Sequence, residues 1–339
     1  MLTPKQLVAA VLTALAALLA IMFACSLVGS ESIALQSVFN PSDTGTPNPD
    51  YEIFMKVRLP RIVLAAIVGA ALAASGVVFQ GLLRNPLADP YILGISSGAG
   101  LGAIIAVVSG IGWTLWGRSP IALFAFVGAL GTVWLVWFIG RLTGRFYVTG
   151  LLLAGVVVNA FLSAVIMFLT AVAKSSEVHA TIFWLMGNMK EESPLVLWLA
   201  GGWVFAGTAS LFFISPRLNA ISFGEQDAAG IGIHVSRTRV TAFSIAALMT
   251  SIAVSLSGLI GFVGLVVPHA VRLLSGPDHR RLLPLSAISG AAFLVVADTV
   301  ARTVVAPAQL PVGVITAMIG GPFFLFLLIK HGKRVGWLQ

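Results

Sequence analysis

Residues 58–90 read RLPRIVLAAIVGAALAASGVVFQGLLRNPLADP, and no charged side chain interrupts the 22 residues from 62 to 83. A helix of roughly 20 apolar residues is long enough to cross the hydrocarbon core of a bilayer. Apolar runs of this kind recur along the 339-residue chain, which is 58% hydrophobic and only 9% charged. The composition therefore predicts an all-α membrane protein with many spans, and it excludes a water-soluble globular domain.

Polar and proline-marked breaks divide the chain into ten expected transmembrane helices, which form a single domain over residues 1–339. The first is longer than the apolar core of a cleaved signal peptide, so we interpret it as a retained span. The break between the seventh and the eighth is marked only by Gly258 and Gly261. The expected helices lie near residues 5–29, 59–83, 93–110, 119–140, 148–172, 193–214, 239–257, 259–274, 284–305 and 311–330.

The positions of lysine and arginine predict the orientation of these helices. If the N-terminus lies in the cytoplasm, 13 of the 20 Lys and Arg residues fall on the cytoplasmic side and 7 on the outer side. Cytoplasmic loops of membrane proteins carry the excess of positive charge, so we expect both termini in the cytoplasm. The net charge of +8 follows from the same bias, and no basic cluster interleaved with aromatics indicates nucleic-acid binding.

The sequence lacks the motifs of a catalytic or nucleotide-binding site. Residues 76–81 have the glycine spacing of a P-loop but continue as Leu-Leu where that motif needs Lys-Ser or Lys-Thr. There is no metal-ligand cluster, carboxylate pair or nucleophile motif, and the single Cys25 leaves no internal disulfide. We therefore expect no enzyme activity, and no cofactor or metal bound by this chain.

The expected spans contain almost no carboxylate or histidine at mid-membrane, where ion-coupled transporters usually carry one. Asp298 and Arg302 stand four residues apart near one helix end, as in a local ion pair. Three functions remain open: a transporter powered by a partner protein, an ion- or proton-coupled secondary transporter, and a passive channel or membrane scaffold. The first requires a docking surface on the cytoplasmic side.

Residues 217–238 form the longest expected cytoplasmic loop. Its SFGE sequence at residues 222–225 has the spacing of a helix-capping box, and glycines follow where such a helix would end. The sequence therefore predicts one short helix outside the membrane. Glu225 and Asp227 lie among arginines on a polar face that suits a partner protein, although a purely structural helix would show the same pattern.

Eight motifs stand in order between residues 58 and 328: RLPR, GAALAASG, QGLLRNPLADPYILGISSGAG, LLLAG, GLIGFVGLVVPHAVR, GPDHRRLLPLSAISGA, ADTVAR and LPVGVITAMIGGPFF. Together they resemble the FecCD-type permeases. These are the membrane subunits of type II ABC importers for iron-siderophores, haem and cobalamin. The set of motifs is specific, whereas any one of them alone is weak.

This resemblance implies a homodimer in the bacterial inner membrane, with ten helices per subunit and a transport pathway between the two copies. It implies two ATP-binding cassette subunits on the cytoplasmic side, which would bind ATP and Mg, and a periplasmic substrate-binding protein on the outer side. The expected function is the inward transport of a metal chelate, and the motifs leave open which chelate is carried.

The resemblance also implies that Arg58, Arg61 and Arg302 are outward-facing cations that dock the binding protein. A cation in the first turn of a helix opposes the helix macrodipole, so an anion is expected near Arg58 and Arg61. For Arg302, a local pair with Asp298 is the alternative.

Further residues match the family's gates and coupling element. Asn85 and Leu87 match a cytoplasmic gate loop, although a plain capped turn would look the same. Val148 and Thr149 match a second constriction, but Val148 stands where the family often has a hydroxyl or charged residue. Residues 175–188 match a short periplasmic helix. The residues that would couple to the ATPase are Ser222, Gly224, Glu225, Asp227, Gly230 and Gly232.

Overall fold

The computed structural model describes residues 4–31, 33, 38, 48–110, 120–142 and 147–332, and the regular structure within these ranges is helical. The expected all-α class is therefore confirmed for this part of the chain. The elements are α1 (Pro4–Leu27), α3 (Pro49–Glu52), η1 (Ile53–Arg58), α4 (Leu59–Leu82), η2 (Pro90–Leu93), α5 (Ile95–Val108), α6 (Ile121–Leu142), α7 (Tyr147–Val172), α8 (Ser175–Leu185), α9 (Pro194–Phe223), α10 (Glu225–Gly230), α11 (Val235–Ser257), α12 (Val263–Ser275), α13 (His279–Thr303) and α14 (Val312–Gly332).

Within the described ranges, seven helical segments are long and apolar enough to cross a membrane: α1, the continuous segment Pro49–Leu82, α6, α7, α9, α11 and α13. Three shorter apolar stretches, α5, α12 and the Val312–Phe326 part of α14, lie where three further spans were expected. Each of the ten expected segments thus contains one helix. The number of membrane crossings itself stays a prediction.

Some helices extend further into polar sequence than hydropathy predicts. α9 continues through Pro216 to Phe223 instead of ending near residue 214. α13 begins at His279, five residues before the expected start, because the Asp278 carboxylate accepts a hydrogen bond of 3.0 Å from the Arg280 N–H. A side-chain acceptor at this position satisfies an N–H that has no partner within the helix.

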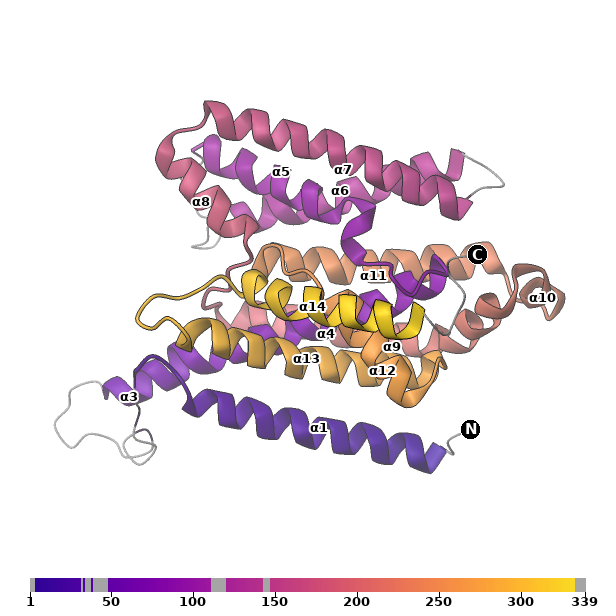
Figure 1. Ribbon diagram of the computed structural model, residues 1–339, viewed down its shortest axis with the longest axis horizontal. Coiled ribbons are helices and arrows are strands. Elements are labelled where there is room, and N and C mark those ends of the chain that lie inside the picture. The colour runs from indigo at the N-terminus through magenta and orange to yellow at the C-terminus, as the bar shows by residue number, and fades with distance from the viewer. Residues whose placement is uncertain are drawn as a thin grey trace.

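α4 is the central helix of the bundle. In the most apolar 18-residue stretch of Pro49–Leu82, 78% of the residues are buried, compared with 6% in the corresponding stretch of α1. α4 packs against α13, α11, α12 and α9, and a Cβ on Gly69 would collide with the Gly290 carbonyl of α13. Small residues allow such close approach of helices in a membrane. Figure 1 shows α1 along one side of the bundle and α7 along the opposite side.

The break between α11 and α12 lies where the two glycines predict it. Gly258 ends α11 with φ of 68°, a left-handed conformation that glycine adopts without strain. The Tyr91 hydroxyl next to this segment donates to the Ile260 carbonyl at 3.0 Å and accepts from the Ile260 N–H at 3.1 Å. The break is therefore an ordered irregular segment held by η2, and its prediction is confirmed.

Helix ends gather into two opposite ends of the bundle. We call the end that carries Arg58, Arg61 and Arg302 the arginine end. There, Arg58 before α4 contacts Ser26 of α1, and α14 begins beside Gly187, just after α8. At the α10 end, the loop after α4 meets the last turn of α9, and α9 meets the start of α13. Figure 1 places α8 and α10 at opposite ends. The helix expected on the outer side, α8, and the helix expected on the cytoplasmic side, α10, thus lie at opposite ends of the bundle, as expected.

Candidate functional site

Two arginines clamp one buried aspartate at the arginine end. Arg61 Nε donates to Asp298 Oδ1 and Arg302 Nε donates to Asp298 Oδ2, each at 3.0 Å. The Arg61 guanidinium also donates to the Gln309 amide oxygen at 2.8 Å. Asp298 is 0% exposed, and the expected ion pair of Asp298 with Arg302 is confirmed. Arg61 brings a second cation from α4 to the same carboxylate.

Arg58 binds the end of α1. Its guanidinium donates to the Ser26 and Leu27 carbonyls at 3.1 Å each, and also to the Glu31 carbonyl. The last carbonyls of a helix have no partner within the helix, so Arg58 satisfies acceptors that would otherwise be open. This contact fixes the C-terminal end of α1 to the start of α4.

The docking prediction assumed that these three arginines are accessible on the surface, but in the structure they are buried. Arg58, Arg61 and Arg302 are at most 5% exposed. The anion expected near Arg61 is Asp298 of the same chain. One donor remains open, because Arg61 Nη2 is buried and has no acceptor among the described residues. Docking of a partner by these residues stays a prediction.

At the α10 end, the chain leaves α4 through a tight turn. Arg84 has φ of 49°, and hydrogen bonds from Arg84 N–H to Gly81 and from Asn85 N–H to Gln80 close the helix as in a Schellman motif. The Asn85 side chain then accepts from the Leu87 N–H at 2.9 Å. This is the capped turn expected of Asn-Pro-Leu. Its role as a gate is untested.

The helix expected in residues 217–238 is present as α10, but its predicted cap is wrong. Ser222 lies in the last turn of α9 and donates to the Leu218 carbonyl at 2.9 Å, so it does not cap α10. Gly224 occupies the N-cap position instead, without a side-chain bond. The error arises because α9 runs through Ser222. The predicted glycine stop is confirmed: Gly230 is the last residue of α10, and Gly232 has φ of 84°.

Glu225 joins α10 to the turn after α4. Its carboxylate accepts from Arg239 of α11 through both oxygens, one of them at 2.9 Å. It also lies 3.5 Å from an Arg84 Nη, and the Arg84 guanidinium donates to the Ile221 carbonyl at 2.9 Å. One carboxylate thus links α10, α11 and the predicted gate loop. The other acidic residue of the predicted coupling face, Asp227, is exposed.

A second polar contact at this end joins α9 to α13. The Asn219 amide donates to Asp278 Oδ1 at 2.6 Å, and its oxygen accepts from the His279 N–H at 2.9 Å. Burial would raise the pKa of the Asp278 carboxyl, but hydrogen bonds from Asn219 and Arg280 and the nearby cations hold that pKa below its ordinary value. The end of α9 is therefore anchored immediately before α10.

The second predicted gate pair lies at the start of α7. Val148 and Thr149 belong to the first turn of Tyr147–Val172, and Thr149 is exposed. The side chain of Val148 lies outside the described part. α7 approaches η2 at Gly155, where a Cβ would crowd the Ile92 carbonyl. The constriction assigned to this pair remains a prediction.

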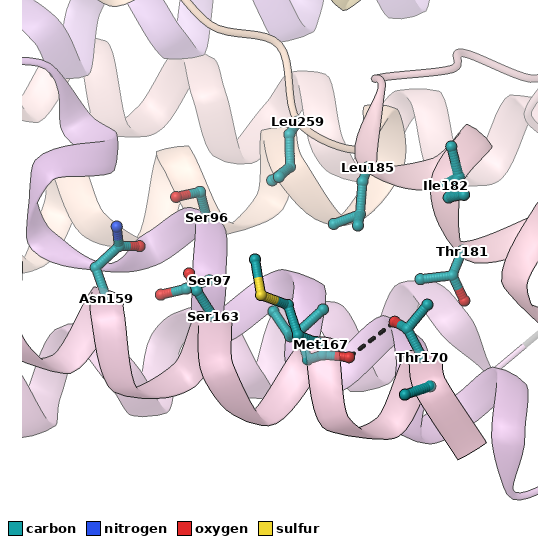
Figure 2. A pocket seen from close by; sticks show the side chains of 12 residues that line it. Ser96, Ser97, Asn159, Ser163, Met167, Thr170, Thr181, Ile182, Leu185 and Leu259 are labelled. Atoms are coloured by element: carbon teal, nitrogen blue, oxygen red, sulfur yellow. Dashed lines mark hydrogen bonds between the residues drawn. The ribbon is translucent and has the colours of Figure 1, made fainter. Parts of the chain in front are cut away.

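A cavity of about 590 Å³ lies between α5, α7, α8 and the segment after α11. Its polar lining comes from Ser96 and Ser97 of α5, Asn159, Ser163 and Thr170 of α7, and Thr181 of α8. Figure 2 shows Asn159, Ser163 and Met167 on one side of the cavity, facing Leu185 and Leu259 on the other. No charged residue lines it among the described residues.

The expected outer helix over residues 175–188 is present as α8, which ends earlier, at Leu185. The Glu177 carboxylate accepts from the Lys174 N–H at 2.9 Å and thereby caps its first turn. Thr181, Ile182 and Leu185 face the cavity. α8 thus closes one wall of the cavity at the arginine end.

Two features of the site had not been predicted from the sequence. The polar stripe on α7, with Asn159, Ser163 and Thr170 spaced by four and seven residues, was detectable as one face of an apolar helix. The partnership of Arg84 with Glu225 had no sequence signal, because the two residues lie on distant segments that only the fold brings together.

Comparisons with known proteins match this arrangement. The model of the FecCD transport family matches residues 16–330. The chain is 46% identical over 87% of its length, and 78% of the relative, to the cobalamin import system permease protein BtuC of Halobacterium salinarum. It is 37% identical over 91% of both chains to the hemin transport system permease protein HmuU of Yersinia pestis. A solved inward-facing metal-chelate type ABC transporter matches 93% of this chain and 98% of its own, with TM-score 0.78 and 30% identity.

Proposed function

Because the chain belongs to the FecCD transport family, we propose that it moves a metal chelate of the iron-siderophore, haem or cobalamin class from a periplasmic binding protein to the cytoplasm. It is a multi-pass membrane permease and not an enzyme. The observation that carries the proposal is similarity over most of the chain to permeases named for cobalamin and hemin. The charge-free polar cavity suits a bulky chelate, because few strong contacts would hold it midway.

We propose ten membrane crossings with both termini in the cytoplasm of a bacterium. Ten apolar helices support the count, of which α5 with 14 residues and α12 with 13 are shorter than a typical span. α1 begins and α14 ends toward the α10 end (Figure 1). The excess of lysine and arginine on that side supports the direction.

Energy would come from two ATP-binding cassette subunits that hold ATP and Mg and seat α10. The chain itself has no nucleotide motif, so force must enter through a contact with a partner. Movement of α10 would act on Glu225, and through Glu225 on Arg84 and on the turn that carries Asn85 and Leu87. Such a rigid contact transmits a two-state movement better than a flexible loop would.

The periplasmic binding protein would dock at the arginine end. Arg61 and Arg302 share one aspartate there, so this pair carries one more positive charge than its counter-ion, and Arg58 lies nearby against the end of α1. A carboxylate of the partner would complement that charge and satisfy the open Arg61 Nη2. Docking requires this cluster to become accessible.

The pathway would lie between two copies of the chain. α7 carries the polar stripe of the cavity, and it also exposes large apolar side chains, including Leu153, Val157 and Phe161. A second copy would cover part of this surface and complete the cavity wall. This arrangement agrees with the homodimer that the family resemblance implies.

A proton- or ion-coupled transporter is the alternative function, and it has less support than the ABC permease. It needs a membrane carboxylate that exchanges its ion during transport. The one carboxylate within the ten expected spans, Asp298, is paired with two guanidiniums and therefore acts as their counter-ion.

The proposal is tested by reconstituting the chain with its ATPase and binding protein in lipid nanodiscs. ATP turnover should rise when the binding protein carries its chelate, and haem, cobalamin and a ferric siderophore should be compared at equal concentration. Turnover that ignores every chelate would contradict the proposed substrate class. Solute uptake that follows a proton gradient without ATP would favour the alternative.

A further inference from the structure

A second cavity, of about 720 Å³, lies between the last turn of α6 and the first turns of α11, at the α10 end. Its size is within the range of small-molecule sites. It is separate from the polar cavity on α7 and shares none of its lining residues. The residues that give it its chemical character are Trp137, Arg141, Glu225, Arg237 and Arg239.

The lining of this cavity carries more positive than negative charge. Three arginines face it and one carboxylate, and that carboxylate already binds Arg239 and Arg84. Arg141 and Arg237 are exposed, and no ion pair joins either of them to a carboxylate in the described ranges. Two guanidiniums are therefore available for an anion, and their planar forks match phosphate geometry.

Trp137 lines the cavity on the α6 side, and further aromatic and apolar side chains lie along the same helix. The Arg141 guanidinium lies 5.5 Å from the centre of the Trp137 ring, and the Trp137 ring lies 5.4 Å from that of Trp134. The Trp137 indole N–H is buried and has no acceptor among the described residues. Leu135 and Phe138 of the same helix are exposed and apolar. The cations thus stand at the end of a surface that fits hydrocarbon chains.

We propose that this cavity binds the phosphate headgroup of an anionic phospholipid. Arg141 and Arg237 would hold the phosphate, the Trp137 ring would stay beside the Arg141 guanidinium, and the acyl chains would lie along Trp134 and Phe138. Basic pockets between transmembrane helices bind anionic headgroups in this way. A free phosphate ion has the same anionic chemistry, but it has no apolar group that would contact the exposed apolar side chains of α6. The site stands independently of the direction of transport and of its substrate.

The test uses the purified full chain and native mass spectrometry. Phosphatidylglycerol should remain bound where phosphatidylcholine with the same acyl chains does not. Arg141→Gln and Arg237→Gln should each weaken phosphatidylglycerol binding about fivefold, which is the usual effect of one cation at an anionic membrane surface. Arg280→Gln is the matched control, because it removes an exposed arginine at the same end but outside the cavity, and its binding should equal that of the unaltered chain.

Three results would overturn the proposal. The first is equal retention of the two lipids by the unaltered chain. The second is displacement of phosphatidylglycerol by millimolar inorganic phosphate, which would make this a site for a soluble anion. The third is loss of the ATPase subunit, with lipid retention unchanged, in the Arg141→Gln and Arg237→Gln variants, which would make it a protein interface. Arg141→Lys keeps the charge, so lipid retention in that variant separates a lost contact from a misfolded chain.

Discussion

At the scale of single residues, the buried ions are the least expected feature. In the hydropathy pattern, Arg61, Asp298 and Arg302 are separate charged residues near helix ends. In the structure they form one ion-pair cluster with almost no exposed surface. The pair four residues apart was predictable from helical spacing. The contribution of Arg61 was not, because it depends on how α4 packs against α13.

Asp298→Asn should destabilise the protein by about 3–5 kcal/mol, because it leaves two buried guanidiniums without a counter-ion. The midpoint of thermal unfolding in detergent measures the change. Glu191→Gln, an exposed acid, is the control and should shift stability by less than about 0.5 kcal/mol. Equal midpoints for Asp298→Asn and the control would show that the cluster does not hold α4 to α13.

Asp89 should make stability depend on pH. Burial raises the pKa of its carboxyl to about 6, although the hydrogen bond from the Tyr91 N–H opposes this effect. A carboxyl with a raised pKa contributes most while it is protonated, so its contribution is complete below about pH 4 and is lost as the pH rises through 6.

Asp89→Asn stays neutral and can keep the hydrogen bond to Tyr91. The unfolding midpoint of this variant should therefore rise relative to that of the unaltered chain as the pH increases from 5 to 7. A constant difference between the two across that range would refute the assignment of the raised pKa to Asp89.

At the scale of elements, the sequence located each apolar helix but not its polar ends. The break at Gly258 was predictable because a positive φ at a helix end favours glycine. The start of α10 was missed because the SFGE pattern fits a capping box only if α9 has already ended, and α9 continues to Phe223. Helix ends outside the lipid are set by tertiary contacts, such as those of Asn219 with Asp278 and His279.

The link between α10 and the gate loop yields a prediction about coupling. Glu225→Gln should lower the amount of chelate transported per ATP hydrolysed while changing stability by about 1 kcal/mol, because the Glu225 carboxylate, which pairs with Arg84 and Arg239, is 43% exposed. Transport and ATP turnover measured on the same proteoliposomes give this ratio.

Arg84→Gln should lower the ratio by the same factor or less, because Glu225 also binds Arg239. The double variant should be no worse than Glu225→Gln alone, since Glu225→Gln already removes the contact with Arg84. Losses that multiply in the double variant would show that Arg84 and Glu225 act separately.

At the scale of the whole molecule, composition and motif order predicted the class of protein and its family. The relative placement of α8 and α10 at opposite ends was also predictable, because apolar spans alternate the sides of successive loops. The cavities were not, because each is formed by side chains from several helices whose packing the sequence does not state.

Orientation can be tested with single cysteines in a Cys25→Ser background. Ser222→Cys at the α10 end should react with a membrane-impermeant maleimide only after cells are opened, whereas Lys174→Cys at the arginine end should react in intact cells with a permeable outer membrane. Both positions are exposed, so reactivity reports the side of the membrane. The opposite labelling pattern would reverse the proposed topology.

The most direct measurement of the central claim is chelate accumulation in proteoliposomes with a defined internal volume. The complete complex, formed with the ATPase and the binding protein, should concentrate the chelate when ATP is supplied to the ATPase side, and the chain alone should not. Accumulation by the chain alone, driven by an ion gradient, would contradict the account.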